Sequence, residues 1–372
     1  MLGSSEPTPT ASKGSSRRAP GCTVAGSVFR LTREQTGHTQ DSVAELLGVA
    51  VDTVAGWESG RRPLTSVPVG QTLAHQALLL REGAPPPLLS TLRRALEADV
   101  LLTDLLGREV RHDDNPLGAW VLRRELVELV SWPLSGVPPT PLRSLPPASR
   151  ARRGPVPAGP RFSAVERERF FTLMRETAER ARRTDQFLLR RQALYLAGYD
   201  DATDTPAWLA YQQRTERPDD WLSQWLNDRS VATVAARHGD GERLDHFISA
   251  TLAASEAAET ANLNYWAYWI GESAHVELSD DFIAQPSWGP WRGDRLMDHL
   301  VRGLTPNHGF FDLNVHTLWA LIASRPDLLS HNAPAALALR DRLPMMLDGT
   351  EPSTRARREL ENIRYAIRLA DA

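Results

Sequence analysis

Residues 39–62 constrain the fold of this chain more than any other stretch. Their sequence is TQDSVAELLGVAVDTVAGWESGRR. Thr39 is a good helix N-cap, and the apolar residues that follow it recur on one helical face. Gly48 can adopt a positive φ and let the chain reverse, and a second short helix is predicted from about Val51 to Ser59. The stretch therefore predicts a helix-turn-helix.

The predicted second helix has a buried and an exposed side. Val54 and Trp57 are three residues apart and belong to the core. The exposed side of this helix is then formed by Val51, Asp52, Thr53, Ala55 and Gly56. Gly60 ends the helix. Arg61 and Arg62 place two permanent positive charges just beyond it, where a phosphate backbone would run.

The segment 28–63 resembles the Xre family, the phage-repressor and Cro type of helix-turn-helix. The resemblance is carried by Gln40, Ala44, Gly48, Val54, Trp57, Glu58 and Gly60. It implies a lambda-repressor-like DNA-binding domain in which Arg33, in the first helix, pairs with Glu58 beneath the surface. It also implies that Gln40 caps the second helix against a phosphate, and that the first residues of the recognition helix meet base edges.

The recognition helix departs from the pattern of that family, whose base-reading positions usually carry Gln, Asn, Ser or Arg. Here those positions are Ala50, Val51, Asp52 and Gly56. Only Asp52 and Thr53 bring hydrogen-bonding atoms. We expect thin direct readout, since each good base contact gives only about 1–3 kcal/mol of discrimination. DNA shape, a dimeric site or the basic tail must supply the rest, unless the domain now binds a partner instead of DNA.

Length and composition indicate a globular protein of two or three units. The chain has 372 residues, of which 41% are hydrophobic and 24% charged, and its net charge is −3. These values are ordinary for a globular chain of this length. Lys13 is the single lysine beside 42 arginines, a bias that fits a GC-rich, actinobacterial genome.

Cys22 is the single cysteine, which excludes a disulfide framework and a cysteine zinc site.

The N-terminal residues offer no targeting signal. No signal-peptide pattern is present, and no apolar run reaches the ~20 residues that a bilayer requires. We expect a cytoplasmic protein whose residues 1–22 form a disordered tail. Lys13, Arg17 and Arg18 could reach a minor groove from this tail, although a solvated tail is the simpler interpretation.

Turn and proline signals divide the rest of the chain. The expected segments are a DNA-binding domain at 23–106, a connecting helix at 107–132, a Pro/Arg-rich linker at 133–162 and a helical sensor and dimerisation domain at 163–372. Trp132 and Pro133 are expected to end the connecting helix. The linker arginines Arg150, Arg152 and Arg153 could add phosphate contacts or simply be solvated.

The expected fold class is all-α. Ser163 to Glu166 form a capping box that opens the last domain. Helical patterns then recur at 221–226, 244–252, 296–304, 313–322 and 360–367, and alternating β-branched runs are nearly absent. Helix pairs could stack as a tetratricopeptide-type solenoid, but the repeat period that such a fold needs is not visible.

Residues 262–272 contain an aromatic cluster. Its members are Tyr265, Trp266, Tyr268 and Trp269. Tyr265 and Trp269 lie four apart on one helical face, and the other two flank them, so that the four rings cannot all face one partner. Core packing is the first interpretation. A dimer partner or an effector pocket lined with rings are the alternatives.

The second half shows no pattern typical of catalysis. Its histidines and carboxylates match no two-histidine zinc helix. Asp312 and His316 are four apart and could touch, but such a pair is more often a helix-stabilising contact. The sequence has no Gly-rich phosphate loop, no serine elbow and no candidate cysteine nucleophile. We expect no enzymatic activity, no cofactor and no metal.

Two functions are therefore compatible with the sequence. The first is a transcription regulator whose head binds double-stranded operator DNA, and whose helical domain forms a homodimer and senses a small molecule, peptide or protein. The plan is similar to large actinobacterial regulators that join an Xre head to a long helical body. The second is a non-catalytic interaction module whose helix-turn-helix no longer reads DNA.

Overall fold

The computed structural model describes residues 23–107, 115–146, 159–215, 220–237, 239–286, 288–305, 309–349 and 352–370. Every regular element in these ranges is a helix, as the sequence predicts, and none is a strand. Contacts divide the chain into two compact units: residues 1–103 with 141–160, and residues 104–140 with 161–372.

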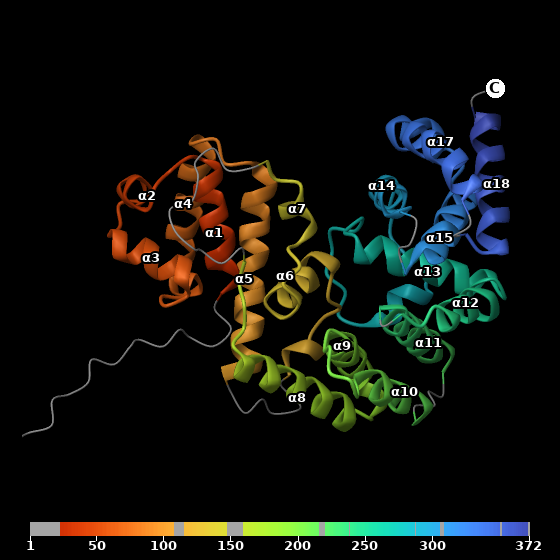
Figure 1. The fold of residues 1–372 in the computed structure, drawn as a ribbon, viewed down its shortest axis with the longest axis horizontal. Coiled ribbons are helices and arrows are strands. Elements are labelled where there is room, and N and C mark those ends of the chain that lie inside the picture. Colours follow the sequence, from red (N-terminus) through yellow and green to blue (C-terminus); the bar gives the residue numbers. More distant parts are fainter. Residues whose placement is uncertain are drawn as a thin grey trace, which may run out of the picture. The chain divides into compact units, whose positions relative to one another are not determined.

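The first unit is built from short helices that follow one another closely along the chain. They are α1 (Val24–Gln35), α2 (Gln40–Leu47), α3 (Val51–Ser59), the 3-10 turn η1 (Leu64–Ser66), α4 (Val69–Arg81) and the start of α5 (Pro86–Gly107) (Figure 1). The helix-turn-helix predicted from the sequence is α2 and α3. Its core includes Val43 and Ala44 from α2, which are buried together with Val54 and Trp57 from α3.

A buried carboxylate on α5 binds the N-terminus of α1. Asp99 on α5 accepts hydrogen bonds from the backbone N–H groups of Thr23, Val24 and Ala25, at 3.2, 2.9 and 3.1 Å. These are groups at the start of α1 that have no partner within the helix. A negative charge at a helix N-terminus also interacts favourably with the helix dipole. Asp99 therefore holds α1 against α5, a role that no local pattern in the sequence indicates.

The segment predicted as a connecting helix folds with the second unit. It contains a 3-10 turn, η3 (Pro116–Gly118), and a helix, α6 (Arg124–Ser135), separated by an extended stretch. In that stretch the Val121 N–H donates to the Glu277 carbonyl at 2.8 Å, and the Leu122 N–H donates to Oε1 of Gln192 at 2.6 Å. These long-range hydrogen bonds take the place of the helix expected in this part of the segment 107–132.

Two further sequence expectations differ at the end of α6. Pro133 lies inside the last turn of the helix instead of ending it, and Gly136, with φ of 71°, forms the C-cap. A proline so close to the end removes one intrahelical hydrogen bond, which a well-buried helix tolerates. The predicted linker contains the short helix α7 (Thr140–Arg143), and the carbonyl of Pro146 accepts a hydrogen bond from Gln35.

The remainder of the second unit is a helical body. Its main helices are α8 (Ala164–Arg180), α9 (Phe187–Ala197), α10 (Thr205–Thr215), α11 (Trp221–Arg237), α12 (Glu242–His246), α13 (Glu256–Trp269), α14 (Asp294–Gly303), α15 (Phe311–Ser324), α16 (Leu328–His331), α17 (Ala333–Asp348) and α18 (Thr354–Ala370). Shorter turns are η4 (Thr184–Gln186), the π-helix η5 (Phe247–Leu252) and η6 (Asp280–Ala284). Ser163 and Glu166 form the predicted capping box of α8.

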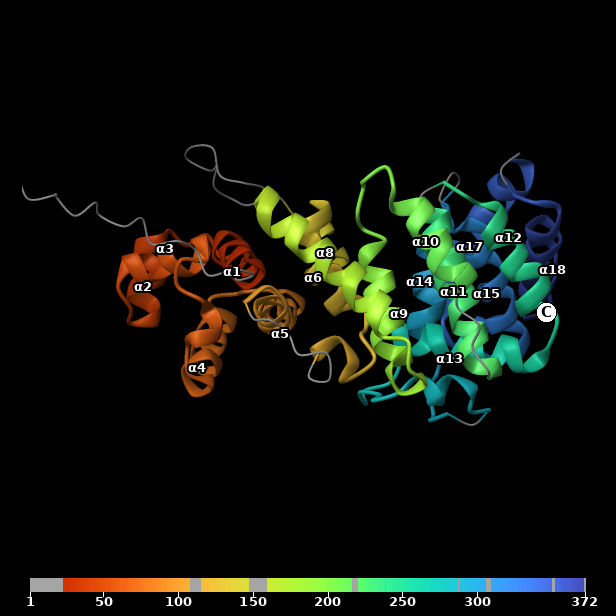
Figure 2. The ribbon, with the colours of Figure 1, turned by 90° about the horizontal axis from the view of Figure 1, so that it is seen from below.

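Helix α15 lies at the centre of this body. It contacts α12, α13, α14 and α18, which come from widely separated parts of the sequence (Figure 2). Ten of its residues are buried. In a solenoid each repeat contacts only its neighbours. The contacts of α15 with α12 and α18 pass over helices that lie between them in the chain, which contacts between neighbouring repeats alone would not produce.

Some sequence expectations lie outside the described residues. These are the predicted tail 1–22, with Lys13, Arg17, Arg18 and Cys22, and the linker arginines Arg150, Arg152 and Arg153. Within the described ranges, no helix combines the length and the apolar character that crossing a membrane requires.

Candidate nucleic-acid interface

Local signals build the helix-turn-helix. Thr39 is the N-cap of α2, and its hydroxyl and that of Ser42 form a reciprocal capping box. Gly48 ends α2 with φ of 66°, and Gly60 ends α3 with φ of 73°. Both values lie in the left-handed region that glycine adopts without steric cost. The turn and both helix ends are therefore those that the sequence predicts.

Buried contacts fix which side of α3 faces solvent. The indole of Trp57 packs edge-on against Phe29 of α1, with ring centroids 5.6 Å apart, and lies 5.7 Å from His75 of α4. Val54 is fully buried one turn earlier. The opposite side carries Val51 and Asp52, which are exposed. This is the side that a helix-turn-helix presents to DNA.

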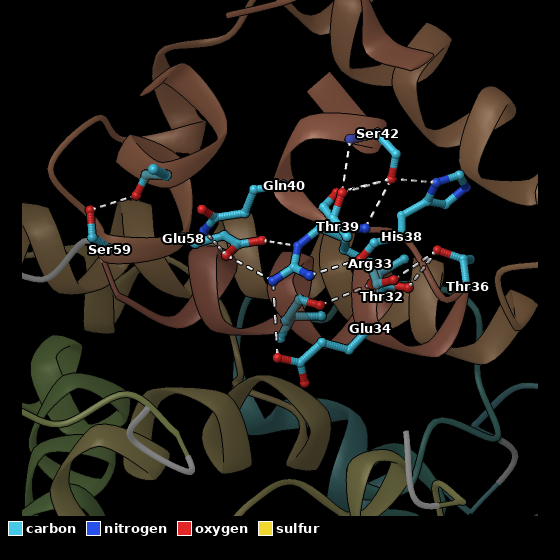
Figure 3. A network of polar contacts seen from close by, with 12 residues as sticks. Thr32, Arg33, Glu34, Thr36, His38, Thr39, Gln40, Ser42, Glu58 and Ser59 are labelled. Atoms are coloured by element: carbon cyan, nitrogen blue, oxygen red, sulfur yellow. Dashed lines mark hydrogen bonds and ion pairs between the residues drawn. The ribbon is translucent and has the colours of Figure 1, made fainter. Parts of the chain in front are cut away.

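A polar network joins the three helices of the motif (Figure 3). Arg33 on α1 holds the Glu58 carboxylate at the end of α3 with two hydrogen bonds, Nε to Oε1 at 2.5 Å and Nη2 to Oε2 at 3.0 Å. Nη1 of Arg33 donates to the carbonyl of His38 at 2.9 Å. Gln40 on α2 donates through Nε2 to Glu58 at 2.7 Å. The carboxylate therefore receives donors from α1 and α2 and fixes their positions relative to α3.

The side-chain amide of Gln40 serves this network. Its nitrogen is the natural donor for the phosphate cap that the family resemblance implies, but here that nitrogen is bonded to Glu58. Gln40 is partly buried at the first position of α2. In this conformation one amide N–H of Gln40 is engaged by Glu58, which leaves the second amide N–H and the backbone N–H as donors at the start of the helix.

Arg61 and Arg62 turn back onto the recognition helix. Nη2 of Arg61 donates to the Asp52 carboxylate and to the Asp52 carbonyl, the latter at 3.3 Å. Arg62 donates through Nη2 to the other Asp52 oxygen at 2.9 Å and through Nη1 to the Thr53 hydroxyl at 2.6 Å. The hydrogen bond from Arg61 and the charges of both arginines hold the pKa of Asp52 below its usual value. The surface keeps a net positive charge, because two guanidinium groups face one carboxylate.

This arrangement differs from the sequence expectation in two respects. The charges of Arg61 and Arg62 were expected beyond the end of the helix, but their guanidinium groups lie beside its first turn. Gly56 was expected on the open surface, but it is buried. A Cβ atom at Gly56 would lie 3.0 Å from Cγ and Cδ of Arg62, so the Arg62 side chain covers this position. The physical reason is that the Arg62 guanidinium hydrogen-bonds to Asp52 and Thr53 on the first turn, so that its side chain runs across the glycine.

The remaining candidate positions on α3 are small or apolar. Ala50 is the N-cap and is exposed, and its methyl group cannot accept a hydrogen bond from the first turn. Val51 is 41% exposed. Ala55 is partly buried. The hydrogen-bonding capacity of the exposed face therefore resides in Asp52 and Thr53 and in the two arginines bonded to them.

The aromatic cluster of the second unit belongs to the core. Trp266 and Tyr268 are buried, and the Tyr268 hydroxyl donates to the carbonyl of Val121 at 2.7 Å. Tyr265 and Trp269 are partly buried and stack on each other with ring centroids 6.3 Å apart. The guanidinium of Arg229 lies 4.0 Å above the Tyr265 ring. The first interpretation from the sequence, core packing, describes this cluster.

A cavity lies elsewhere in the same unit. It has a volume of about 190 Å³ between α9, α10 and α11, and the four aromatic residues do not line it. Its lining is mainly aliphatic and includes Leu194, Leu209 and Val234. Asp240 and Arg243, which are paired at 3.0 Å, complete it. No periodicity in the sequence indicated this cavity, because its walls come from α9, α10, α11, α12 and the turn before α12.

Comparison with known protein families supports the assignment of the first unit. A family model described as a helix-turn-helix domain matches residues 25–75. This range contains α1, α2 and α3, with the first part of α4. Comparison with curated proteins and with solved structures found no match. The chain therefore contains a helix-turn-helix domain of the kind that binds DNA, followed by a larger all-helical region.

Proposed function

We propose that this protein is a sequence-specific transcription regulator of the Xre type that inserts α3 into the major groove of operator DNA. The observation that carries the proposal is the exposed face of α3, where the guanidinium groups of Arg61 and Arg62 lie beside the first turn, in a domain that matches a helix-turn-helix family model. A major groove admits an α-helix, and its phosphates attract arginine.

The positive charge of this face exceeds its negative charge. Asp52 is the single carboxylate bonded to both arginines. The side chains of Asp52, Arg61 and Arg62 are 59%, 39% and 49% exposed, so phosphate oxygens can reach the guanidinium groups. Binding to DNA exchanges the interaction between Arg61 and Asp52 for an interaction between Arg61 and a phosphate. Surface ion pairs are weak enough for such an exchange, about 0–1 kcal/mol each.

The finer parts of the proposal concern the whole regulator. We infer that the protein is cytoplasmic and has no enzymatic activity. We also infer that it is a homodimer, because two recognition helices about 34 Å apart can enter successive major grooves. The helical body would dimerise and bind an effector. The aliphatic cavity between α9, α10 and α11 supports an effector with a small apolar group, since a cavity of this size accommodates a benzene-sized group.

A second candidate function is a protein-interaction module. Two observations favour it: the polar side chains of the α3 face are bonded to one another, and α4 exposes Val69, Leu73 and Leu80. Exposed apolar side chains on one helix suit a protein partner better than a phosphate backbone. In this case the helix-turn-helix would serve as a scaffold.

Selection of bound duplexes from a random DNA pool separates the two functions. The full-length protein should recover an enriched sequence. The double variant Arg61→Ala, Arg62→Ala should bind every duplex more weakly, and the slope of its salt dependence should fall by about one unit for each phosphate that is no longer neutralised. The matched control is Arg94→Ala, which removes an exposed arginine paired with Glu97 on α5. Recovery of no sequence above background would instead support the interaction module.

A further inference from the structure

The side chain of Arg62 follows an unusual course. The residue lies after the end of α3, and its backbone N–H donates to the carbonyl of Gly56 at 3.0 Å. From there its side chain runs back along the helix, so that Nη1 reaches Thr53 at 2.6 Å and Nη2 reaches Asp52 at 2.9 Å. Arg62 thereby places a guanidinium group on the first turn of the recognition helix, the part that lies deepest in a major groove.

Gly56 makes this course possible. A Cβ atom at this position would meet Cγ and Cδ of Arg62 at 3.0 Å and its Cβ at 3.2 Å, closer than such atoms normally approach. Glycine is disfavoured in the interior of a helix, but at position 56 it leaves room for the side chain of Arg62. The aliphatic part of Arg62 occupies the space that any other side chain at position 56 would take.

The guanidinium group keeps donors for a ligand. Arginine has five N–H donors in a planar fork, and Thr53 and Asp52 each accept one of them. The three others are not used by these two partners. Because Thr53 and Asp52 hold its two terminal nitrogens, the Arg62 side chain loses less conformational freedom on binding than a solvated arginine would. A donor fork that is fixed and half-exposed is suited to reading a base edge.

Arg61 provides a contrast on the same surface. It also bonds Asp52, through the carboxylate and the backbone carbonyl, and both bonds use the single nitrogen Nη2. Its side chain does not cover Gly56, because the three atoms nearest to that position all belong to Arg62. Arg61, with one terminal nitrogen engaged by Asp52, is therefore left for an interaction with a phosphate.

We propose that Arg62 is the main base-reading residue of this protein and that it recognises a guanine. Guanine presents two acceptors, O6 and N7, in the major groove, and the arginine fork matches them with two parallel hydrogen bonds. Thr53 and Asp52 are positioning residues that orient the fork, and Gly56 leaves room for it. The inference rests on the proposed DNA binding and adds the class of base that the operator must contain.

The first experiment compares arginine with lysine at both positions. Duplexes are selected from a random pool by wild type, Arg62→Lys and the matched control Arg61→Lys. Lysine keeps the charge but lacks the fork. We expect Arg62→Lys to lose one guanine preference from the selected half-site, with about tenfold less discrimination there, while Arg61→Lys keeps the wild-type preference. The same selection is made with Arg62→Met, whose side chain has no hydrogen-bond donor, and an unchanged guanine preference in that variant would overturn the inference and leave the proposed function intact.

The second experiment tests the interaction atom by atom. Replacing the selected guanine with 7-deazaguanine removes the N7 acceptor, which should weaken wild type about tenfold and affect Arg62→Lys much less. Gly56→Ala should behave like Arg62→Lys in the selection, because the added methyl group displaces the Arg62 side chain; circular dichroism verifies that the variant is folded. Equal sensitivity of wild type and Arg62→Lys to 7-deazaguanine would contradict a direct interaction. Failure of wild type to select any sequence would remove both the inference and the proposed function.

Discussion

At the scale of single residues, Glu58 is the point where the three helices of the motif meet. Its carboxylate is bonded by Arg33 and Gln40 at distances of 2.5 to 3.0 Å, and its side chain is only 6% exposed. A mostly buried carboxylate with three hydrogen bonds is stable only while its partners are present, and the partners depend equally on the carboxylate.

Removal of this carboxylate should destabilise the first unit. In Glu58→Ala, Arg33 keeps its bond to the His38 carbonyl but loses both bonds to the acid, and Gln40 loses its acceptor. We expect a loss of about 2 kcal/mol in the free energy of opening, measured by hydrogen exchange of peptides from residues 24–60. Glu58→Gln, which keeps the shape and one acceptor oxygen, should lose less. Equal exchange in wild type and Glu58→Ala would show that the ion pair does not stabilise the unit.

At the scale of elements, α1 and α3 approach each other most closely at Gly26. A Cβ atom there would lie 2.2 Å from the carbonyl oxygen of Trp57. Backbone atoms cannot move aside as a flexible side chain can, so the crossing of these two helices depends on the missing side chain.

The prediction for this crossing concerns Gly26→Ala. The added methyl group must push α1 away from α3, which should lower the stability of the first unit by about 1–3 kcal/mol. The control is Gly70→Ala on α4, where an added Cβ meets no atom within 4 Å and alanine is the better helix former. Hydrogen exchange over residues 24–60 should increase only in the first variant. The crossing is not tight if both variants exchange alike.

His316 connects three helices of the second unit. Its ring nitrogens bond Glu259 on α13 at 2.6 Å and Glu359 on α18 at 2.7 Å, so its partners are these glutamates rather than Asp312 on its own helix. Burial disfavours the charged ring, but the hydrogen bonds and charges of both glutamates outweigh this effect and raise the pKa of His316 to about 9. The protonated ring thus bridges two carboxylates.

This bridge predicts a specific dependence of stability on pH. A pKa raised in the folded state contributes stability below the unfolded value, about 6.5, and the contribution is lost as the pH rises through about 9. We expect the free energy of unfolding to fall by on the order of 3 kcal/mol across this interval, measured by urea titration with tryptophan fluorescence. His316→Gln should remove most of the dependence, whereas His331→Gln, at an exposed site, should not. A flat profile in wild type would contradict the bridge.

At the scale of the whole molecule, the proposed regulator depends on two copies of α3 acting together. The predicted dimer should bind two half-sites about 10 base pairs apart from centre to centre. Inserting five base pairs between the half-sites places one of them on the opposite side of the duplex. We expect this insertion to weaken binding roughly a hundredfold, because only one half-site can then be bound, and a ten-base-pair insertion to restore part of the affinity. Gel-shift titration measures the effect, and equal affinity at every spacing would indicate binding by single copies.

Signals that act within a turn or two of helix were readable from the sequence. Thr39 starts α2, Gly48 and Gly60 end the two helices, and Val54 with Trp57 marks the buried side of α3. Each depends on backbone conformation or on the helical period, which neighbouring residues determine. The all-helical class and the boundaries of α2 and α3 follow from such local preferences.

Contacts between distant residues required the tertiary structure. Asp99 lies 75 positions from Val24, whose N–H donates to it, and His316 bonds a glutamate 43 positions away. Arg62 is close to Thr53 and Asp52 in sequence, yet its course depends on a side chain bending back across a glycine, which no periodicity encodes. The sequence by itself determined helix positions and the class of the first domain, because these arise locally. Only the tertiary structure decided which charged groups meet, because that depends on how the helices pack and where long side chains can reach.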